Sequence, residues 1–306
     1  MQLRCQGFPP YDWTPLDVSS LPEDGEEQIG TKDKFWVCND EGTERWLWKQ
    51  ARSKGGTPRG EDWAECLVHV IAQLLGLPSP CVSLATRKDE RGVLIRNLLG
   101  DGQELEHGNE VLAKHIKGYD SSTKREYPLY TVSNIRYALQ EIAGPPPYSS
   151  WTAFDVISGY LMLDALVSGC DRHHTNWGII KTADKSSSIL APTFDHGNAL
   201  GFTVPENKVQ KLLDNEDILR KWVEKGRNKY FQGKPRMADV AVEALSSASI
   251  DSREYFRCRL LDLSLKDVTD AAKAFPKQIL SAERARLACK IVDVNRGRLL
   301  DAISAG

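Results

Sequence analysis

The polar segment Gly169–Gly178 (GCDRHHTNWG), together with Pro192–Gly197 (PTFDHG), constrains this chain more than any other part of its sequence. Between the two segments, the apolar runs 177–180 and 188–191 flank Lys181–Ser187, which consists of polar and turn-forming residues. Two short apolar runs around such a stretch predict a β-hairpin. The chain is therefore expected to bring both polar segments to the same end of one hairpin.

The hairpin would place two oxygen-bearing side chains next to each other. With its turn centred between Lys185 and Ser186, Asn176 lies opposite Asp195. Amide and carboxylate oxygens suit Mg²⁺, which keeps several waters and takes its other ligands from carboxylates and phosphates. The sequence therefore predicts that Asn176 and Asp195 ligate one Mg²⁺.

Asp171 precedes Asn176 by five positions, and Asp195 begins an Asp-x-Gly triplet. The catalytic loop of protein kinases has the same step from a catalytic Asp to a metal-binding Asn, followed later by a metal-binding Asp-x-Gly. The pattern predicts an ATP-dependent phosphoryl-transfer site in which Asp171 orients a hydroxyl nucleophile. The alternative is an ordinary polar loop followed by a surface hairpin.

A long apolar stretch comes directly before this loop. Residues Phe154–Val167 are apolar nearly all round, which predicts a buried helix, and Gly169 lies at a position typical of a helix C-cap. A rigid buried helix can hold a following polar loop in place.

Composition excludes several classes of protein. The chain has 306 residues, a formal net charge of −2 and a pI near 6.3, which argue against nucleic acid as the main partner. Its seven cysteines include no C-x-x-C pair, which favours a reducing compartment over a disulfide scaffold or a zinc site. The N-terminus has no signal core, and Asp164 interrupts the longest apolar run, so no membrane span is expected. A cytoplasmic protein is predicted.

Predicted strands and helices divide the chain in two. Aromatic, β-prone runs at 35–38 and 45–49 surround the hairpin signal Asn39–Gly42, and a helix is expected after Gly60. Two further strands follow, at 81–85 and 92–95, and after Asn97 the pattern is helical apart from the hairpin described above. We predict an α+β, bilobal, protein-kinase-like fold. A small antiparallel β-rich N-lobe (1–97) would precede a large α-helical C-lobe (98–306), with ATP between them.

The sequence resembles the HipA-like kinases, bacterial serine/threonine kinases best known as toxins of toxin–antitoxin pairs. The resemblance runs from about Ile29 to Leu300. Its strongest segments are Gly30–Trp36, Gly60–Glu65, Cys170–Trp177 and Phe194–Gly197. The Asp-Arg-His-x-x-Asn string also resembles that of phosphatidylinositol kinases. Longer HipA proteins carry an additional N-terminal subdomain, whereas this chain is expected to start almost directly at the kinase lobe.

The resemblance implies a role for individual residues. Asp171 would be the catalytic Asp, and His173 matches the motif histidine that lies near the transferred phosphate. Asn176 and Asp195 would be the Mg²⁺ ligands. Residues implied to bind ATP are Gly30, Thr31, Lys32 and Lys34 of the nucleotide loop, Lys49 at the α/β-phosphates with Glu65 as its ion-pair partner, and the backbone from Ile95 through Asn97 to Leu98 at adenine.

Other interpretations remain open for several of these residues. Lys49 could be an ordinary charged end of a strand. Glu65 lies almost opposite the apolar stripe of its helix, where acids are normally solvated. His173 and His174 lack a third ligand for zinc, and His196 is expected to be structural. The basic and aromatic stretch 220–231 favours a solvated helix face or a substrate-docking segment over nucleic-acid binding.

We predict a Mg²⁺/ATP-dependent kinase acting on a Ser or Thr hydroxyl of a protein. The alternatives are a small-molecule or lipid kinase, and a nucleotide-binding pseudokinase or interaction module. A toxin role, with a small helix-turn-helix antitoxin as partner, rests on the resemblance alone. Autophosphorylation of Thr31 would place a phosphate that repels the ATP phosphates. Ser53 and Thr57 are competing phosphorylation sites. The alternative is that Thr31 only satisfies backbone groups in a turn.

Overall fold

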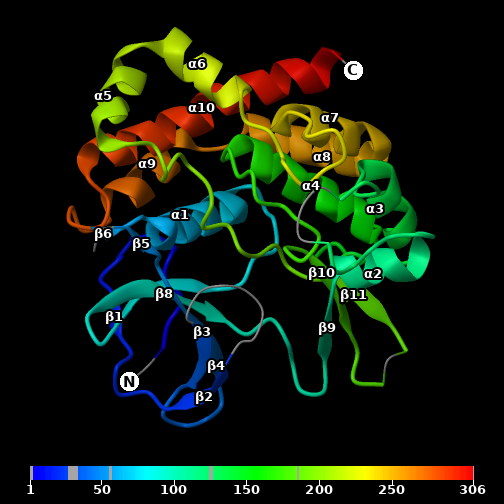
Figure 1. Cartoon of the computed structure of the whole chain (residues 1–306), viewed down its shortest axis with the longest axis horizontal. Coiled ribbons are helices and arrows are strands. Elements are labelled where there is room, and N and C mark those ends of the chain that lie inside the picture. Colours follow the sequence, from blue (N-terminus) through cyan, green and yellow to red (C-terminus); the bar gives the residue numbers. More distant parts are fainter. Residues whose placement is uncertain (1–2, 27–33, 55–56, 124–126, 185, 306) are drawn as a thin grey trace.

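The structure is a computed structural model that describes residues 3–26, 34–54, 57–123, 127–184 and 186–305. A β-sheet region at the N-terminus is followed by a mainly helical part, so the expected α+β class is confirmed (Figure 1). The strands are β1 Leu16–Asp17, β2 Glu23–Glu26, β3 Lys34–Cys38, β4 Arg45–Gln50, β5 Ser53–Lys54, β6 Thr57–Pro58, β7 Val82–Arg87, β8 Glu90–Arg96, β9 Glu104–His107, β10 Gly178–Lys181 and β11 Ser188–Leu190. The helices are α1 Glu61–Leu74, α2 Gly108–His115, α3 Val132–Leu139, α4 Ala153–Leu166, α5 Glu206–Asp214, α6 Glu216–Glu224, α7 Met237–Ser247, α8 Ile250–Leu261, α9 Leu265–Lys273 and α10 Ala282–Ala305.

The main sheet has the strand order β1-β7-β8-β4-β3-β2 and is antiparallel except for the β1–β7 pair. The predicted β3–β4 hairpin is present, and its turn is closed by Asn39, whose side-chain oxygen accepts from two backbone N–H groups. Along β4 the side chains alternate between the two faces of the sheet. Trp46 and Trp48 pack in a small core on one face, which leaves Leu47 and Lys49 on the face toward α1.

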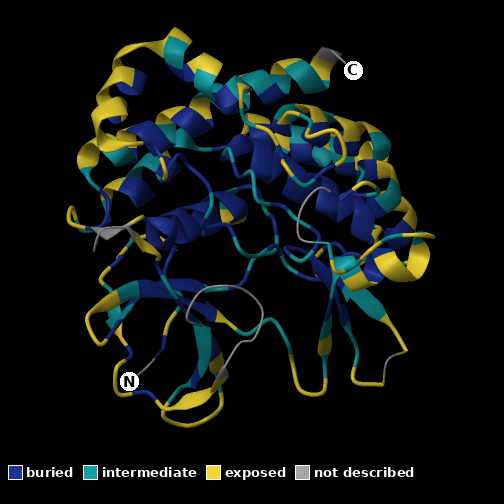
Figure 2. Cartoon of the chain, in the orientation of Figure 1, coloured by how far each residue is buried: buried dark blue, intermediate teal, exposed yellow. Residues whose placement is uncertain are grey.

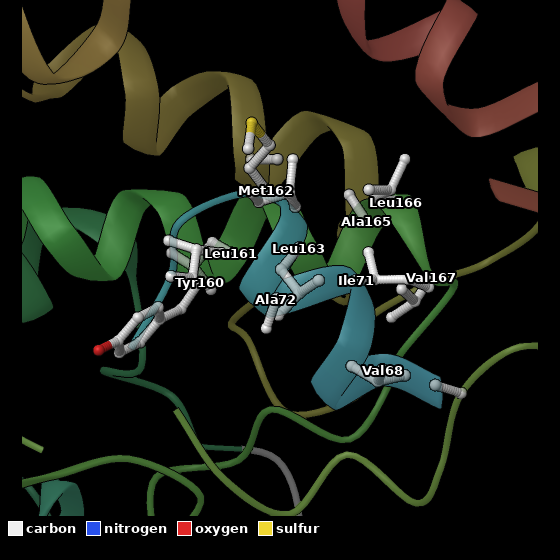
Figure 3. Packing of buried hydrophobic residues seen from close by; sticks show 14 of the residues in the cluster. Val68, Ile71, Ala72, Tyr160, Leu161, Met162, Leu163, Ala165, Leu166 and Val167 are labelled. Carbon is white, nitrogen blue, oxygen red and sulfur yellow. The ribbon is translucent and has the colours of Figure 1, made fainter. Parts of the chain in front are cut away.

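Helix α1 lies between the sheet and the helical part and is buried almost all round (Figures 1 and 2). It packs against β7 and β8 on one side and against α9 on another, and Val68, Ile71 and Ala72 join the same cluster as the α4 residues (Figure 3). The alternative in which Glu65 is an ordinary solvated acid is therefore wrong. Elements on opposite sides of the helix cover both of its faces.

Helix α4 is the buried helix predicted before the polar loop. A capping box between Thr152 and Asp155 begins it, and every residue in it is buried. After the end of α4, the residue with a left-handed backbone conformation is Ser168 (φ 53°). Gly169, which was predicted at the C-cap, does not have this conformation. Instead, the Gly169 backbone N–H donates to the carbonyl of Asp164 (2.7 Å) and closes the end of the helix.

A second, three-stranded sheet has the order β11-β10-β9. Strands β10 and β11 form the predicted hairpin, but its register differs by two positions because Ile179 pairs with Leu190 instead of Pro192. The Asp184 carboxylate accepts hydrogen bonds from Thr182 and Ser186 and fixes the turn earlier than expected. Strand β9 was not predicted, since the sequence after Asn97 was expected to be helical apart from this hairpin.

The cysteine pattern favoured a reducing compartment over a disulfide scaffold, but Cys5 and Cys81 form a disulfide that ties the N-terminal segment to the start of β7. The two residues lie 76 positions apart, which a search for closely spaced cysteine pairs does not detect. Within the described ranges, every helix is too short or too polar to cross a bilayer.

Helix α4 packs against α8 at Gly159, where an added Cβ would lie 2.5 Å from the Phe256 ring. We expect Gly159→Ala to lower the free energy of unfolding by about 1–3 kcal/mol, because the fully buried Phe256 ring or the helix backbone would have to shift. Gly297→Ala is the matched control, since this exposed glycine of α10 has no atom within 4 Å of an added Cβ. It should gain about 1 kcal/mol from helix propensity. Urea denaturation of both variants tests this, and equal stabilities would contradict it.

Candidate active site

Asp171, Asn176 and Asp195 line one cavity, although the altered hairpin register does not place Asn176 directly opposite Asp195. Asp171 and Asn176 lie in the loop between α4 and β10, and Asp195 follows β11. The structure thus brings together the three side chains that the sequence pattern singled out. Their chemical roles remain predictions.

The donor set fits a magnesium ion. The Asn176 amide nitrogen donates to the backbone carbonyl of Asp171 (2.8 Å), so the amide oxygen is the atom that could coordinate a metal ion. Together with the Asp195 carboxylate it would supply hard oxygen ligands, as Mg²⁺ prefers. No cluster of three His, Cys, Asp or Glu side chains able to hold a metal occurs in the described part of the chain. Water and phosphate would complete the shell.

Lys49 of β4 meets Asp195, although the two residues are 146 positions apart. The Lys49 ammonium donates to the Asp195 carboxylate and lies 3.7 Å from Glu65 Oε2 of α1. Burial disfavours the charged form of Lys49, but the carboxylates of Asp195 and Glu65 outweigh this effect and raise its pKa. Lys49 is therefore a buried, permanently charged cation next to the candidate metal ligand.

Glu65 also holds the backbone that carries Asp195. Its Oε1 accepts from the backbone N–H of His196 (2.8 Å), the residue that follows Asp195. Asp195 has a φ of 60°, a left-handed conformation that is uncommon for a residue with a side chain and is often found at functional sites. The His196 imidazole is buried and lies 2.9 Å from the Thr193 hydroxyl. Burial and the nearby Arg172 guanidinium lower the pKa of His196 to about 3, so it stays neutral.

Arg172, directly after Asp171, forms a two-pronged buried ion pair with Asp164 of α4. Both N–O distances are 2.7 Å. Burial would lower the pKa of Arg172, but the Asp164 carboxylate outweighs it and raises the pKa. The same guanidinium donates to the backbone carbonyls of Asn176 (2.6 Å) and Phe194 (3.5 Å). Arg172 therefore joins the loop after α4 to the segment before Asp195.

The roles of Asp164 and Arg172 were not predicted from the sequence. A usable signal was present, since a carboxylate inside an otherwise apolar buried helix requires a partner. The sequence alone does not say which of the many Lys and Arg residues provides it.

The two histidines of the loop have different surroundings. His173 Nδ1 lies 2.8 Å from the Thr175 hydroxyl, and its ring contacts Tyr230 edge-on. Burial lowers the pKa of His173, against the opposing effect of Asp171 and Asp195. His174 is buried and stacks on Tyr127 at 3.9 Å, and burial lowers its pKa to about 4. A phosphate contact by His173 stays a prediction.

The predicted nucleotide-binding residues are placed only in part. Gly30, Thr31 and Lys32 lie outside the described residues, whereas Lys34 pairs with Lys49 across β3 and β4. Ile95 lies within β8, paired with both of its neighbouring strands. The backbone N–H of Asn97 donates to the carbonyl of Arg45 (2.9 Å), so it is not available to adenine. The adenine contact stays a prediction.

Tyr230, in the segment between α6 and α7, donates to Asp171 Oδ1 at 2.9 Å. This contact was missed, since the stretch 220–231 was expected to be a solvated face or a docking segment. A mixture of basic and aromatic residues in sequence does not indicate which aromatic side chain turns inward.

Comparison with solved structures identifies the fold. The chain is similar to the proinflammatory kinase CtkA of Helicobacter pylori, with a TM-score of 0.76, 17% identity, and coverage of 95% of this chain and 98% of CtkA. It is also similar to HipA of a Shewanella oneidensis MR-1 toxin–antitoxin system, solved with HipB and operator DNA (TM-score 0.51, 10% identity, coverage 93% and 69%). No protein-family model matches, and no curated protein sequence matches significantly. The resemblance to HipA-like kinases is therefore confirmed at the level of the fold.

Proposed function

We propose that this chain, which has the fold of the HipA-like kinases, is an ATP-dependent kinase that phosphorylates a Ser or Thr hydroxyl of a protein. One observation carries the proposal. Lys49 of the N-terminal sheet pairs with both Glu65 of α1 and Asp195, and Asp195 lines the same cavity as Asp171 and Asn176. These are the residue types that phosphoryl transfer needs for phosphate, metal and acceptor.

In the proposed reaction, the acceptor oxygen forms a bond to the γ-phosphorus of ATP. The bond from that phosphorus to the bridging oxygen breaks, and ADP leaves. Asp171 would orient the hydroxyl and accept its proton, while Lys49 would neutralise charge on the α- and β-phosphates. Asn176 and Asp195 would hold Mg²⁺, which when bound offsets negative charge on the phosphate oxygens.

The proposal includes a bilobal organisation. Residues 1–97 would form the N-lobe and residues 98–306 the C-lobe, with ATP between β4 and the segment containing Asp195. The position of Lys49 supports this, because its strand belongs to the sheet while its partner Asp195 belongs to the mainly helical part. The largest buried cluster includes residues of α1, α4 and α10, so relative motion of the two parts would have to preserve that packing.

The toxin hypothesis is part of the proposal and rests on the likeness to a HipA solved with HipB and operator DNA. A small helix-turn-helix antitoxin would be the partner, and a cytoplasmic location would follow. Contact of this chain itself with nucleic acid is not expected, since its net charge is −2.

The acceptor class is tested by incubating the protein with Mg²⁺, γ-³²P-ATP and a cell lysate, and then separating proteins from metabolites. We expect label on Ser or Thr residues of lysate proteins. Label only in the small-molecule or lipid fraction would contradict the protein-kinase proposal and favour the other acceptors. Thermal stabilisation by Mg²⁺ and ATP without any transfer would instead indicate a pseudokinase.

A further inference from the structure

A tyrosine far along the chain contacts the candidate catalytic carboxylate. The Tyr230 hydroxyl donates to Asp171 Oδ1 at 2.9 Å, across a separation of 59 positions. Asp171 lines the cavity that it shares with Asn176 and Asp195, whereas Tyr230 does not. The phenol therefore contacts the carboxylate without occupying the space next to the candidate metal ligands.

Tyr230 is held by its own segment. The Asn228 side chain is completely buried, and its amide nitrogen donates to the carbonyl of Arg172 (3.4 Å), the residue after Asp171. Its amide oxygen accepts from the backbone N–H of Tyr230 (3.0 Å). Phe231 is buried as well. The segment is thus attached to the catalytic loop by a buried side chain on one side of Tyr230 and packed into the core on the other.

The ring of Tyr230 is fixed by stacking. It lies 5.6 Å from the Tyr127 ring at an interplanar angle of 17°, and Tyr127 in turn stacks on His174 at 3.9 Å. The Lys229 ammonium lies 4.9 Å from the Tyr230 ring centre. Burial, followed by the Asp171 carboxylate, raises the pKa of Tyr230, so the phenol keeps its proton and remains a hydrogen-bond donor at neutral pH.

We infer that Tyr230 is a positioning residue for Asp171. The Tyr230 hydroxyl holds Oδ1 of the Asp171 carboxylate and leaves Oδ2 for the acceptor hydroxyl. The inference rests on the proposed function, because it takes Asp171 as the group that orients the acceptor. A carboxylate on a loop has to be kept close to its productive orientation, and a hydrogen bond from a fixed neighbouring segment does this. Because Asn228 attaches the segment that carries Tyr230 through a buried side chain, this segment is a permanent part of the site and not a mobile cover.

The test uses Tyr230→Phe, which keeps the stacked ring and removes only the hydroxyl. We expect kcat for phosphoryl transfer to fall by about 10–100-fold, a range taken from the loss of hydrogen-bond partners that orient metal-ligating side chains. The KM for ATP should not change, since Lys49 and Asp195 are untouched. Tyr137→Phe is the control, because Tyr137 is an exposed residue of α3, and this variant should keep the wild-type kcat.

A second measurement does not depend on activity. 3-Fluorotyrosine is placed at position 230 of two full-length proteins, one with Asp171 and one with Asp171→Asn. ¹⁹F NMR then follows the titration of the phenol in each protein. We expect the phenol pKa to fall in Asp171→Asn, because a carboxylate disfavours the phenolate. Cys170, Tyr127, Lys229 and His173 face the phenol in both proteins, so the difference isolates Asp171.

Three results would overturn the inference alone: an unchanged or increased kcat in Tyr230→Phe, equal phenol pKa values in the two fluorinated proteins, or phosphate on Tyr230 of the active wild type. The last would make the hydroxyl an acceptor. A wild type that transfers no phosphate would instead overturn the proposed function, and with it the role given to Tyr230.

Discussion

Asp195→Asn is expected to lower Mg²⁺-dependent phosphoryl transfer by on the order of 1,000-fold, because the change removes the charge of a proposed metal ligand while keeping the volume of the side chain. The Lys49 ammonium loses its closest carboxylate but keeps Glu65 at 3.7 Å, so the fold should persist. Transfer measured across a Mg²⁺ titration would show the loss together with a weaker apparent affinity for the metal. Thermal stabilisation by Mg²⁺ with ATP should shrink in parallel.

The matched control is Asp184→Asn in the turn of the same hairpin. Asp184 is exposed, and an Asn at this position keeps the side-chain oxygen that accepts from Thr182 and Ser186 and fixes the turn, so transfer should match the wild type. An Asp195→Asn protein with wild-type rates and an unchanged Mg²⁺ dependence would show that Asp195 is not a metal ligand.

Arg172→Met is expected to lower the free energy of unfolding by about 3–5 kcal/mol, the usual cost of leaving one charge of a buried ion pair without its partner. Asp164 would remain buried inside α4, where its side chain is 5% exposed. The backbone carbonyls of Asn176 and Phe194 would also lose their donor. Urea denaturation of the wild type and the variant measures the difference.

A double variant separates stability from the order of the loop. Asp164→Leu combined with Arg172→Met removes both charges, so much of the lost stability should return, as replacement of a buried ion pair by apolar residues is often neutral. Phosphoryl transfer should be low in both Arg172→Met and the double variant, because in each the carbonyl of Asn176 has lost the Arg172 donor. Additive losses of stability in the two single variants and the double variant would contradict this account of the pair.

The hairpin and its polar flanks were predictable because turn residues and apolar runs act locally. The exact pairing was not, since Asp184 fixes a different turn and shifts the register by two positions. Asn176 and Asp195 nevertheless line one cavity. The Arg172 guanidinium donates to the carbonyls of both Asn176 and Phe194. Hydrophobic periodicity in the sequence does not predict such a contact between separate segments.

Other features depend on contacts between distant segments. Glu65 was identified by resemblance, while the pattern of its own helix placed it in solvent, because one helix does not reveal what covers its second face. Strand β9 is short and rich in polar residues, and it pairs with β10 about seventy positions later, so no local signal marks it. The Tyr230 contact with Asp171 is of the same kind.

Asp171 is proposed to serve phosphoryl transfer from ATP. Its most direct test is a single-turnover measurement with γ-³²P-ATP, Mg²⁺ and the acceptor fraction, comparing the wild type with Asp171→Ala. Label should reach the acceptor with the wild type. With Asp171→Ala the rate should fall by at least about 100-fold while ATP affinity and unfolding are nearly unchanged, because the role proposed for Asp171 is to orient the acceptor and not to bind the nucleotide. Transfer at the wild-type rate in purified Asp171→Ala would contradict the account.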